Sequence, residues 1–108
     1  RKKAEVHENI YSCGDLTVDC NKRTVKRGEK DIELSPKEYS VLLYLIRNQN
    51  IVVTREQIEA NIWDFERYGS SNLVDVYIRN LRKKIDDGFE KKMIQTIRGV
   101  GYLLKETE

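Results

Sequence analysis

The segment NLVDVYIRNLRKKID, residues 72–86, decides the fold because it reads as one amphipathic helix. Projection at about 100° per residue places four apolar residues on one narrow stripe: Val74, Ile78, Leu81 and Ile85. The opposite side collects a polar set with one valine at its centre: Asn72, Val76, Arg79, Asn80 and Lys83. We expect this helix to end before Asp87-Gly88, with its apolar stripe against a core and with Asp75 completing its N-terminal cap.

Two capping boxes precede this helix. Ser35-Pro36-Lys37-Glu38 has proline at the first helical position and opens an apolar helical pattern that runs to about Asn48. Thr54-Arg55-Glu56-Gln57 opens a second, short helix that should end at Trp63. Residues 64–71 then form a loop before the third helix.

The remaining segments alternate with period two, which is typical of strands. Residues 10–34 contain turn signals at Gly14-Asp15, Asn21-Lys22 and Gly28-Glu29, so they predict four short antiparallel strands. Residues 93–97 and 102–104 predict two more, joined by a tight turn over residues 98–101, whose glycines allow a sharp reversal. The sequence therefore predicts an α+β fold with an N-terminal four-stranded sheet, three helices and a C-terminal hairpin. Residues 51–53 are only a short β-branched run.

Size and composition favour one domain. The chain has 108 residues, 39% of them hydrophobic, which supplies one modest core. Residues 1–9 are polar and aperiodic and are interpreted as a linker remnant, with the domain spanning 10–108. The longest uncharged run, residues 39–46, is too short to cross a membrane, and no apolar leader follows the N-terminal cations. We therefore expect no membrane contact and a cytoplasmic location.

Little in the composition suggests metal, cofactor or catalytic chemistry. Cys13 and Cys20 are interpreted as thiols, although a disulfide between them is possible in principle. His7 is the only histidine and lies in the charged leader, so the sequence predicts no metal site and no cofactor. No serine or cysteine nucleophile can be given a partner base, so no catalytic residue and no enzyme activity are expected.

The charge is segregated along the chain. Net charge is +2, but residues 77–85 contain four cations and no acid, and residues 91–105 contain four more. These segments total +8, so the remainder carries −6. Such separation predicts a polyanionic partner, with an ordinary solvated helix face as the alternative.

The polar face of the third helix suits the major groove of DNA. Arg79 and Lys83 can meet phosphates, the amides of Asn72 and Asn80 can bond base edges, and Val76 can meet a thymine methyl. Three residues flank the two faces, where they either reach the DNA backbone or snorkel: Tyr77, Arg82 and Lys84.

Two further residues have alternative interpretations. Arg98, at the hairpin turn without an acidic neighbour, suits a minor groove, or it is an incidental arginine of a surface turn. Trp63 is either mostly core or a donor to a phosphate.

Four blocks of sequence together resemble the OmpR/PhoB family of winged-helix transcription regulators, over about residues 10–104. They are LSPKEY (34–39), VTREQ (53–57), VDVYIRNLRKKI (74–85) and TIRGVGY (96–102). The resemblance implies a winged helix-turn-helix in which the third helix, about residues 72–86, enters the major groove. The hairpin, about residues 93–104, is then the wing, with Arg98 in the minor groove.

The same resemblance assigns roles to residues and partners. Val76, Arg79 and Asn80 would face bases or nearby phosphates, and the implied phosphate contacts are Arg82, Lys83, Thr96, Trp63 and Tyr77. The loop expected to contact RNA polymerase comprises Asp64, Phe65, Glu66, Arg67, Tyr68, Gly69, Ser70 and Ser71. Two copies would bind head-to-tail on tandem half-sites of double-stranded DNA, and a receiver domain would belong to the full-length protein.

The sequence departs from the family pattern at three positions. Asn80 replaces a frequent arginine, Asp64 a frequent glycine and Leu73 a frequent threonine, so the base preference and one backbone contact are in question. The main hypothesis is phosphorylation-controlled transcriptional regulation. The alternatives are a winged helix that docks an acidic protein and, with no supporting constellation, an enzyme.

Overall fold

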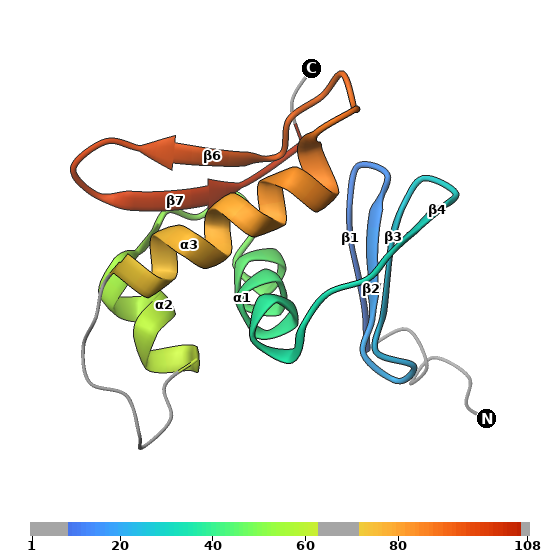
Figure 1. The fold of residues 1–108 in the computed structure, drawn as a ribbon, viewed down its shortest axis with the longest axis horizontal. Coiled ribbons are helices and arrows are strands. Elements are labelled where there is room, and N and C mark those ends of the chain that lie inside the picture. Colours follow the sequence, from blue (N-terminus) through green and yellow to red (C-terminus); the bar gives the residue numbers. More distant parts are fainter. Residues whose placement is uncertain (1–8, 63–71, 107–108) are drawn as a thin grey trace.

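The computed structural model describes residues 9–62 and 72–106 (Figure 1). Four short strands form an antiparallel sheet in the order β1-β2-β3-β4: β1 Ile10–Cys13, β2 Leu16–Asp19, β3 Thr24–Arg27 and β4 Lys30–Ile32. This confirms the four strands predicted from the alternating pattern. Trp63 and the loop over residues 64–71 lie outside the described residues.

The first two helices begin where the capping boxes predict. Helix α1, Pro36–Arg47, starts after Ser35, whose hydroxyl accepts a hydrogen bond from the Glu38 amide while the Glu38 carboxylate accepts from the Ser35 amide. Helix α2, Arg55–Ile62, starts after Thr54, which exchanges the same pair of hydrogen bonds with Gln57. Each box satisfies amide groups that the first helical turn leaves without a partner.

The third helix and the hairpin follow the prediction with two additions. Helix α3, Asn72–Leu81, continues into a π-helical turn, Arg82–Asp86, and the hairpin consists of β6 Ile94–Ile97 and β7 Gly101–Leu104. Strand β5, Val53–Thr54, pairs with β7, so the wing is a three-stranded sheet in the order β5-β7-β6. The last residue of the β-branched run, Val53, therefore forms with Thr54 a third strand, which the sequence did not assign.

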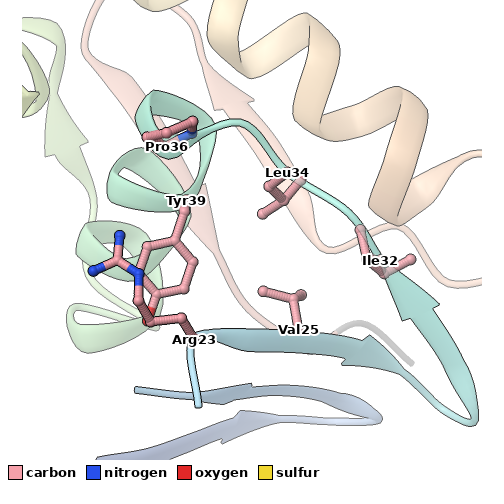
Figure 2. A pocket seen from close by; sticks show the side chains of 6 residues that line it. All are labelled: Arg23, Val25, Ile32, Leu34, Pro36 and Tyr39. Atoms are coloured by element: carbon pink, nitrogen blue, oxygen red, sulfur yellow. The ribbon is translucent and has the colours of Figure 1, made fainter. Parts of the chain in front are cut away.

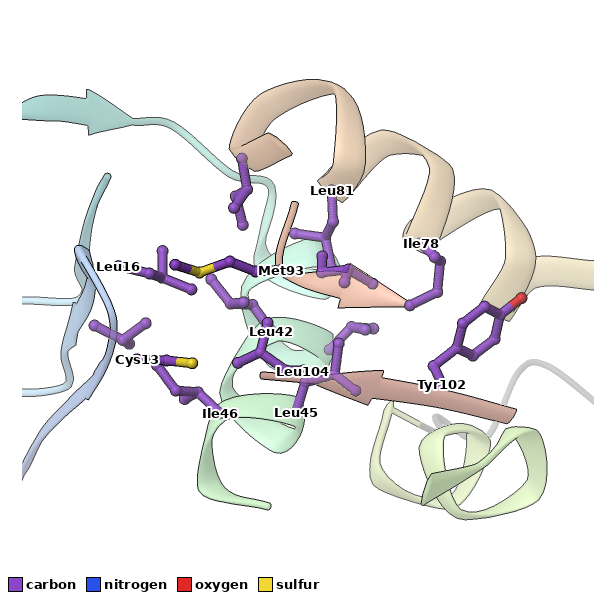
Figure 3. Close-up of a cluster of buried hydrophobic side chains, with 14 of the residues drawn as sticks. Cys13, Leu16, Leu42, Leu45, Ile46, Ile78, Leu81, Met93, Tyr102 and Leu104 are labelled. Atoms are coloured by element: carbon purple, nitrogen blue, oxygen red, sulfur yellow. The ribbon is translucent and has the colours of Figure 1, made fainter. Parts of the chain in front are cut away.

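Helix α1 lies at the centre of the molecule, between the N-terminal sheet and helices α2 and α3 (Figure 1). Its apolar side chains meet those of β1, β2, α3 and the wing in one core, part of which is drawn in Figure 3. The predicted stripe of α3 is buried, with at most 1% of each side chain exposed: Val74, Ile78, Leu81 and Ile85. One face of α3 is thus fixed against the body, and the other is left to solvent.

A small pocket of about 130 Å³ lies between strands β3 and β4 and the start of α1 (Figure 2). Apolar side chains line most of it, and the guanidinium of Arg23 lies 4.8 Å from the ring centre of Tyr39. The pocket is smaller than those that usually enclose a small organic ligand, which are roughly 300–1,000 Å³. Within residues 9–62 and 72–106, no helix is long and apolar enough to span a bilayer, and no cluster of acidic, cysteine or histidine side chains could hold a metal ion.

Candidate nucleic-acid interface

The solvent-facing side of α3 carries the residues predicted to meet DNA. Val76 is 38% exposed, Arg79 and Lys83 are exposed, and Asn80 is half-buried. Tyr77 is half-buried and packs against the core. Only the backbone of Asn72 is described, as the first residue of the helix. An apolar valine therefore sits among cations and an amide on the exposed face of α3.

Asp75 attaches the first turn of α3 to two other elements. Its Oδ1 accepts hydrogen bonds from Nε of Arg55, at 3.1 Å, and from the hydroxyl of Tyr102 on β7. The Tyr102 hydrogen bond, together with the Arg55 guanidinium, holds the pKa of Asp75 below its usual value despite partial burial. The negative charge still lies near the positive end of the helix dipole. The carboxylate therefore also bonds α2 and the wing, while the cap that the sequence predicted for it involves the start of the helix, which lies at the edge of the described residues.

Arg82 attaches the end of α3 to the wing. Its Nε donates to the carbonyl oxygen of Ile94 at 3.2 Å, and its Nη2 donates to Oγ1 of Thr96 at 2.6 Å. Both residues were predicted to bind phosphates, and the structure places them against each other. Because a guanidinium has five N–H donors, two such bonds orient the group and leave other donors for a ligand.

Lys84, which the sequence placed on the flank of the helix, has an internal partner. Its Nζ lies 2.7 Å from Oε1 of Glu38, the same carboxylate that completes the cap of α1. Desolvation opposes ionisation of Glu38, but hydrogen bonds from Lys84 and Ser35 outweigh it and lower the pKa of the carboxyl. The count of four cations over residues 77–85 therefore overstates the positive charge of this surface, because Glu38 supplies an acid from a distant part of the sequence.

The sequence did not predict a buried ion pair between Arg27 and Asp86. Arg27, at the end of β3, and Asp86, at the end of the π-helical turn, are 2% and 3% exposed, and their nearest charged atoms are 3.5 Å apart. One signal was available, because the period of two places Arg27 on the same side of β3 as buried Val25. A cation on the inward face of a strand needs partners, and the structure shows them.

The wing ends in an exposed turn. Arg98, Gly99 and Val100 are exposed, and Val100 is 50% exposed. Gly99 has a φ of +76°, so this residue makes the reversal that the sequence attributed to both glycines. Gly101 serves close packing instead, because a Cβ there would lie 2.8 Å from Cα of Thr54 and closer still to the carbonyl oxygen of Val53. Together α3 and the wing present exposed cations at two places, as the sequence predicted.

Comparison with known proteins agrees with this geometry. The family model described as "Transcriptional regulatory protein, C terminal" matches residues 28–104. YkoG of Bacillus subtilis, an uncharacterized transcriptional regulatory protein, is 50% identical over 103 residues, which cover 95% of this chain and 45% of YkoG. The transcriptional regulatory protein CusR of Escherichia coli K12 is 40% identical over 105 residues, covering 97% and 46%. The chain thus spans about half the length of these curated relatives.

Solved structures share the fold. The response regulator DrrB of Thermotoga maritima, an OmpR/PhoB homolog, matches with a TM-score of 0.79 and 39% identity, covering 90% of this chain and 44% of DrrB. The RstA DNA-binding domain of Klebsiella pneumoniae, solved with the RstA box, matches with a TM-score of 0.77 and 32% identity, covering 89% and 96%.

An N-terminal sheet, three helices and a hairpin beside the last helix define a winged-helix DNA-binding domain. The chain belongs to the family of C-terminal domains of transcriptional regulatory proteins, of the OmpR/PhoB type found in response regulators.

Proposed function

We propose that this chain is the DNA-binding output domain of a two-component response regulator, with α3 in the major groove and the wing in the adjacent minor groove. One observation carries the proposal: α3 and the π-helical turn that continues it bury their whole apolar stripe and leave Val76, Arg79 and Lys83 exposed. A helix with that exposed face matches the dimensions and the chemistry of a major groove.

The exposed residues have different roles in this proposal. Val76, Asn80 and Arg79 contact base edges together with Asn72, whose assignment rests on the sequence. Lys83 and Tyr77 contact phosphates, Arg98 enters the minor groove, and Trp63 remains a backbone contact expected from the sequence. Arg82 and Thr96 contact phosphates as a hydrogen-bonded pair, because their mutual bond orients both side chains toward one place.

The partners of the full-length protein are also part of the proposal. Since the matched relatives are about twice as long, we infer that residues 1–9 join a receiver domain whose phosphorylation controls binding. Two copies then bind head-to-tail on tandem half-sites, and residues 64–71 contact RNA polymerase. Such a regulator works in the cytoplasm, where its DNA is.

Selection from a randomised duplex library tests DNA binding directly. Titrations of the selected duplex at several salt concentrations should show a steep fall in affinity, because neutralised phosphates release counterions. Recovery of no preferred sequence would contradict the proposal and favour the alternative of a module that docks an acidic protein.

Substitutions on α3 and on the π-helical turn test which residues contact bases and which contact phosphates. Asn80→Ala and Val76→Ala should change the selected sequence, whereas Lys83→Ala should weaken all duplexes alike and reduce the salt slope by about one. Lys26→Ala, an exposed lysine on β3 far from α3 in sequence, is the matched control for loss of one cation. Equal losses on every duplex for the Asn80, Val76 and Lys83 variants would contradict the assignment of base and phosphate contacts.

A further inference from the structure

We propose that Arg27 is a positioning residue for sequence-specific DNA recognition: it sets the geometry between α3 and the wing without touching DNA. The inference rests on the proposed function and deepens it. Arg27 belongs to the N-terminal sheet, which makes no DNA contact in the proposed function, and it is 2% exposed. Its charge is therefore withdrawn from any phosphate.

Three hydrogen bonds direct the Arg27 guanidinium to three different segments. Nε donates to Oδ1 of Asp15 at 2.5 Å, Nη1 to the carbonyl oxygen of Ile85 at 2.6 Å, and Nη2 to the carbonyl oxygen of Lys91 at 2.7 Å. The ring centre of Phe89 lies 4.4 Å from its central carbon. Ile85 is in the π-helical turn and Lys91 precedes the wing, so one planar group fixes the spacing between those two segments.

Asp86 completes the connection from the opposite side. Its Oδ1 accepts from the amide of Met93 at 2.9 Å and its Oδ2 from the amide of Ile94 at 3.1 Å, which is where β6 begins. Both charges of the pair are buried, so removal of Arg27 would take this counter-charge from the buried Asp86 carboxylate, whereas Arg27 itself is also paired with Asp15. The end of α3 and the base of the wing are thus held by one ion pair anchored in the sheet.

Because Arg27 sets this geometry without contacting DNA, it should affect the affinity for a specific sequence and leave the non-specific affinity unchanged. Direct contacts to base edges require well-defined geometry, whereas non-specific binding depends mainly on how many cations meet phosphates. The π-helical turn carries Arg82 and Lys83, and the wing carries Arg98. Altering their mutual placement should lower affinity for the selected duplex while the number of phosphate contacts stays the same.

Two variants test the proposal, and one matched substitution controls for it. Arg27→Lys keeps the charge and loses the forked geometry. Asp15→Asn removes the negative charge next to Nε at a side chain that is 51% exposed, so this variant is expected to fold. Lys26→Arg makes the reverse exchange at the adjacent, exposed position. Dissociation constants are measured on the selected duplex and on a random duplex, at a temperature where unfolding curves show each protein fully folded.

For Arg27→Lys we expect an increase of about tenfold in Kd on the selected duplex, which equals ~1.4 kcal/mol. Asp15→Asn should give about threefold, and Lys26→Arg no change. Kd on the random duplex and the salt slope should stay as in the wild type, and the amides of Met93 and Ile94 should exchange faster in both variants.

Other outcomes overturn the proposal. Equal losses on both duplexes would indicate a purely structural role. If Arg27→Lys does not fold, an unchanged ratio of the two Kd values for Asp15→Asn is sufficient to reject the proposal. A wild-type domain that selects no sequence would contradict the proposed function instead, and amide exchange at Met93 and Ile94 would still decide whether Arg27 holds the wing.

Discussion

The hydroxyl of Tyr102 donates a hydrogen bond to the carboxylate of Asp75, so the second strand of the wing is attached to the first turn of α3. Arg55 donates to the same oxygen from the start of α2. One carboxylate oxygen therefore joins the three elements that make up the helix-turn-helix and its wing. At the other end of α3, Arg82 and the buried Arg27–Asp86 pair make separate connections to the wing.

Tyr102→Phe should lower the free energy of unfolding by about 1–2 kcal/mol, because the buried ring stays and a hydrogen bond to a charged group is lost. Denaturant unfolding monitored by circular dichroism measures this change. Tyr44→Phe is the control, since no hydrogen bond to its hydroxyl is present among residues 9–62 and 72–106. The same loss in both variants would contradict a specific role for the Asp75 contact.

Acid should destabilise the domain through Asp75 and Glu38. The pKa of Asp75 is lowered by the Tyr102 hydrogen bond and the Arg55 guanidinium; that of Glu38 is lowered because hydrogen bonds from Lys84 and Ser35 outweigh desolvation. A depressed folded-state pKa gives stability that is complete above the unfolded values, 3.8 for Asp75 and 4.5 for Glu38. That stability is lost as pH falls through the lower, folded-state values.

The acid limb is the part of the stability curve in which the free energy of unfolding falls as the pH is lowered. Asp75→Asn and Glu38→Gln should each reduce its slope, and Glu38→Gln should do so while keeping a residue that can cap α1. Urea titrations at a series of pH values from about 6 downward measure the slope. Glu29→Gln, an exposed residue of the β3–β4 turn, controls for the loss of one carboxylate. An acid limb as steep in both variants as in the wild type would reject the assignment.

Local signals in the sequence predicted the elements well. The two capping boxes begin α1 and α2, because the reciprocal hydrogen bonds involve residues only three positions apart. The period of 3.6 identified the buried stripe of α3, since a helix must hide its apolar side. The alternating pattern identified the four N-terminal strands in the same way.

Contacts between distant residues could not be predicted in this way. Glu38 and Lys84 are 46 positions apart, and Arg27 and Ile85 are 58 apart, so only the folded topology brings them together. Strand β5 has two residues, too few for a period, and is defined by its pairing with β7. The sequence therefore identified the cations of α3 but not which of them are held by internal partners.

Two glycines of the wing should respond differently to the same substitution. Gly101→Ala should destabilise strongly and detach β5 from β7, because the added methyl would meet the backbone of Val53 and Thr54. Gly99→Ala has open space around it and should cost about 1 kcal/mol from the left-handed φ alone. Thermal unfolding compares the two, and amide exchange at Thr54 reports the pairing with β7. A larger loss for Gly99→Ala would contradict this explanation.

The Arg82–Thr96 contact makes a prediction about energetic coupling in DNA binding. If each side chain met a phosphate independently, the effects of Arg82→Gln and Thr96→Val on the free energy of binding would add. Because Nη2 of Arg82 donates to Oγ1 of Thr96 at 2.6 Å, either substitution already releases the partner. We expect the double variant to lose less than the sum of the single losses, with a coupling of about 0.5–3 kcal/mol in a double-mutant cycle.

The control cycle pairs Thr96→Val with Lys83→Ala, an exposed neighbour of Arg82 that makes no hydrogen bond to Thr96, and it should be additive within about 0.5 kcal/mol. Titration of the selected duplex gives all the affinities needed for both cycles. Additivity in the Arg82 cycle would mean that the two side chains separate when DNA binds and contact it independently. Coupling in both cycles would point to a general disturbance of the wing, because Lys83 has no direct path to Thr96.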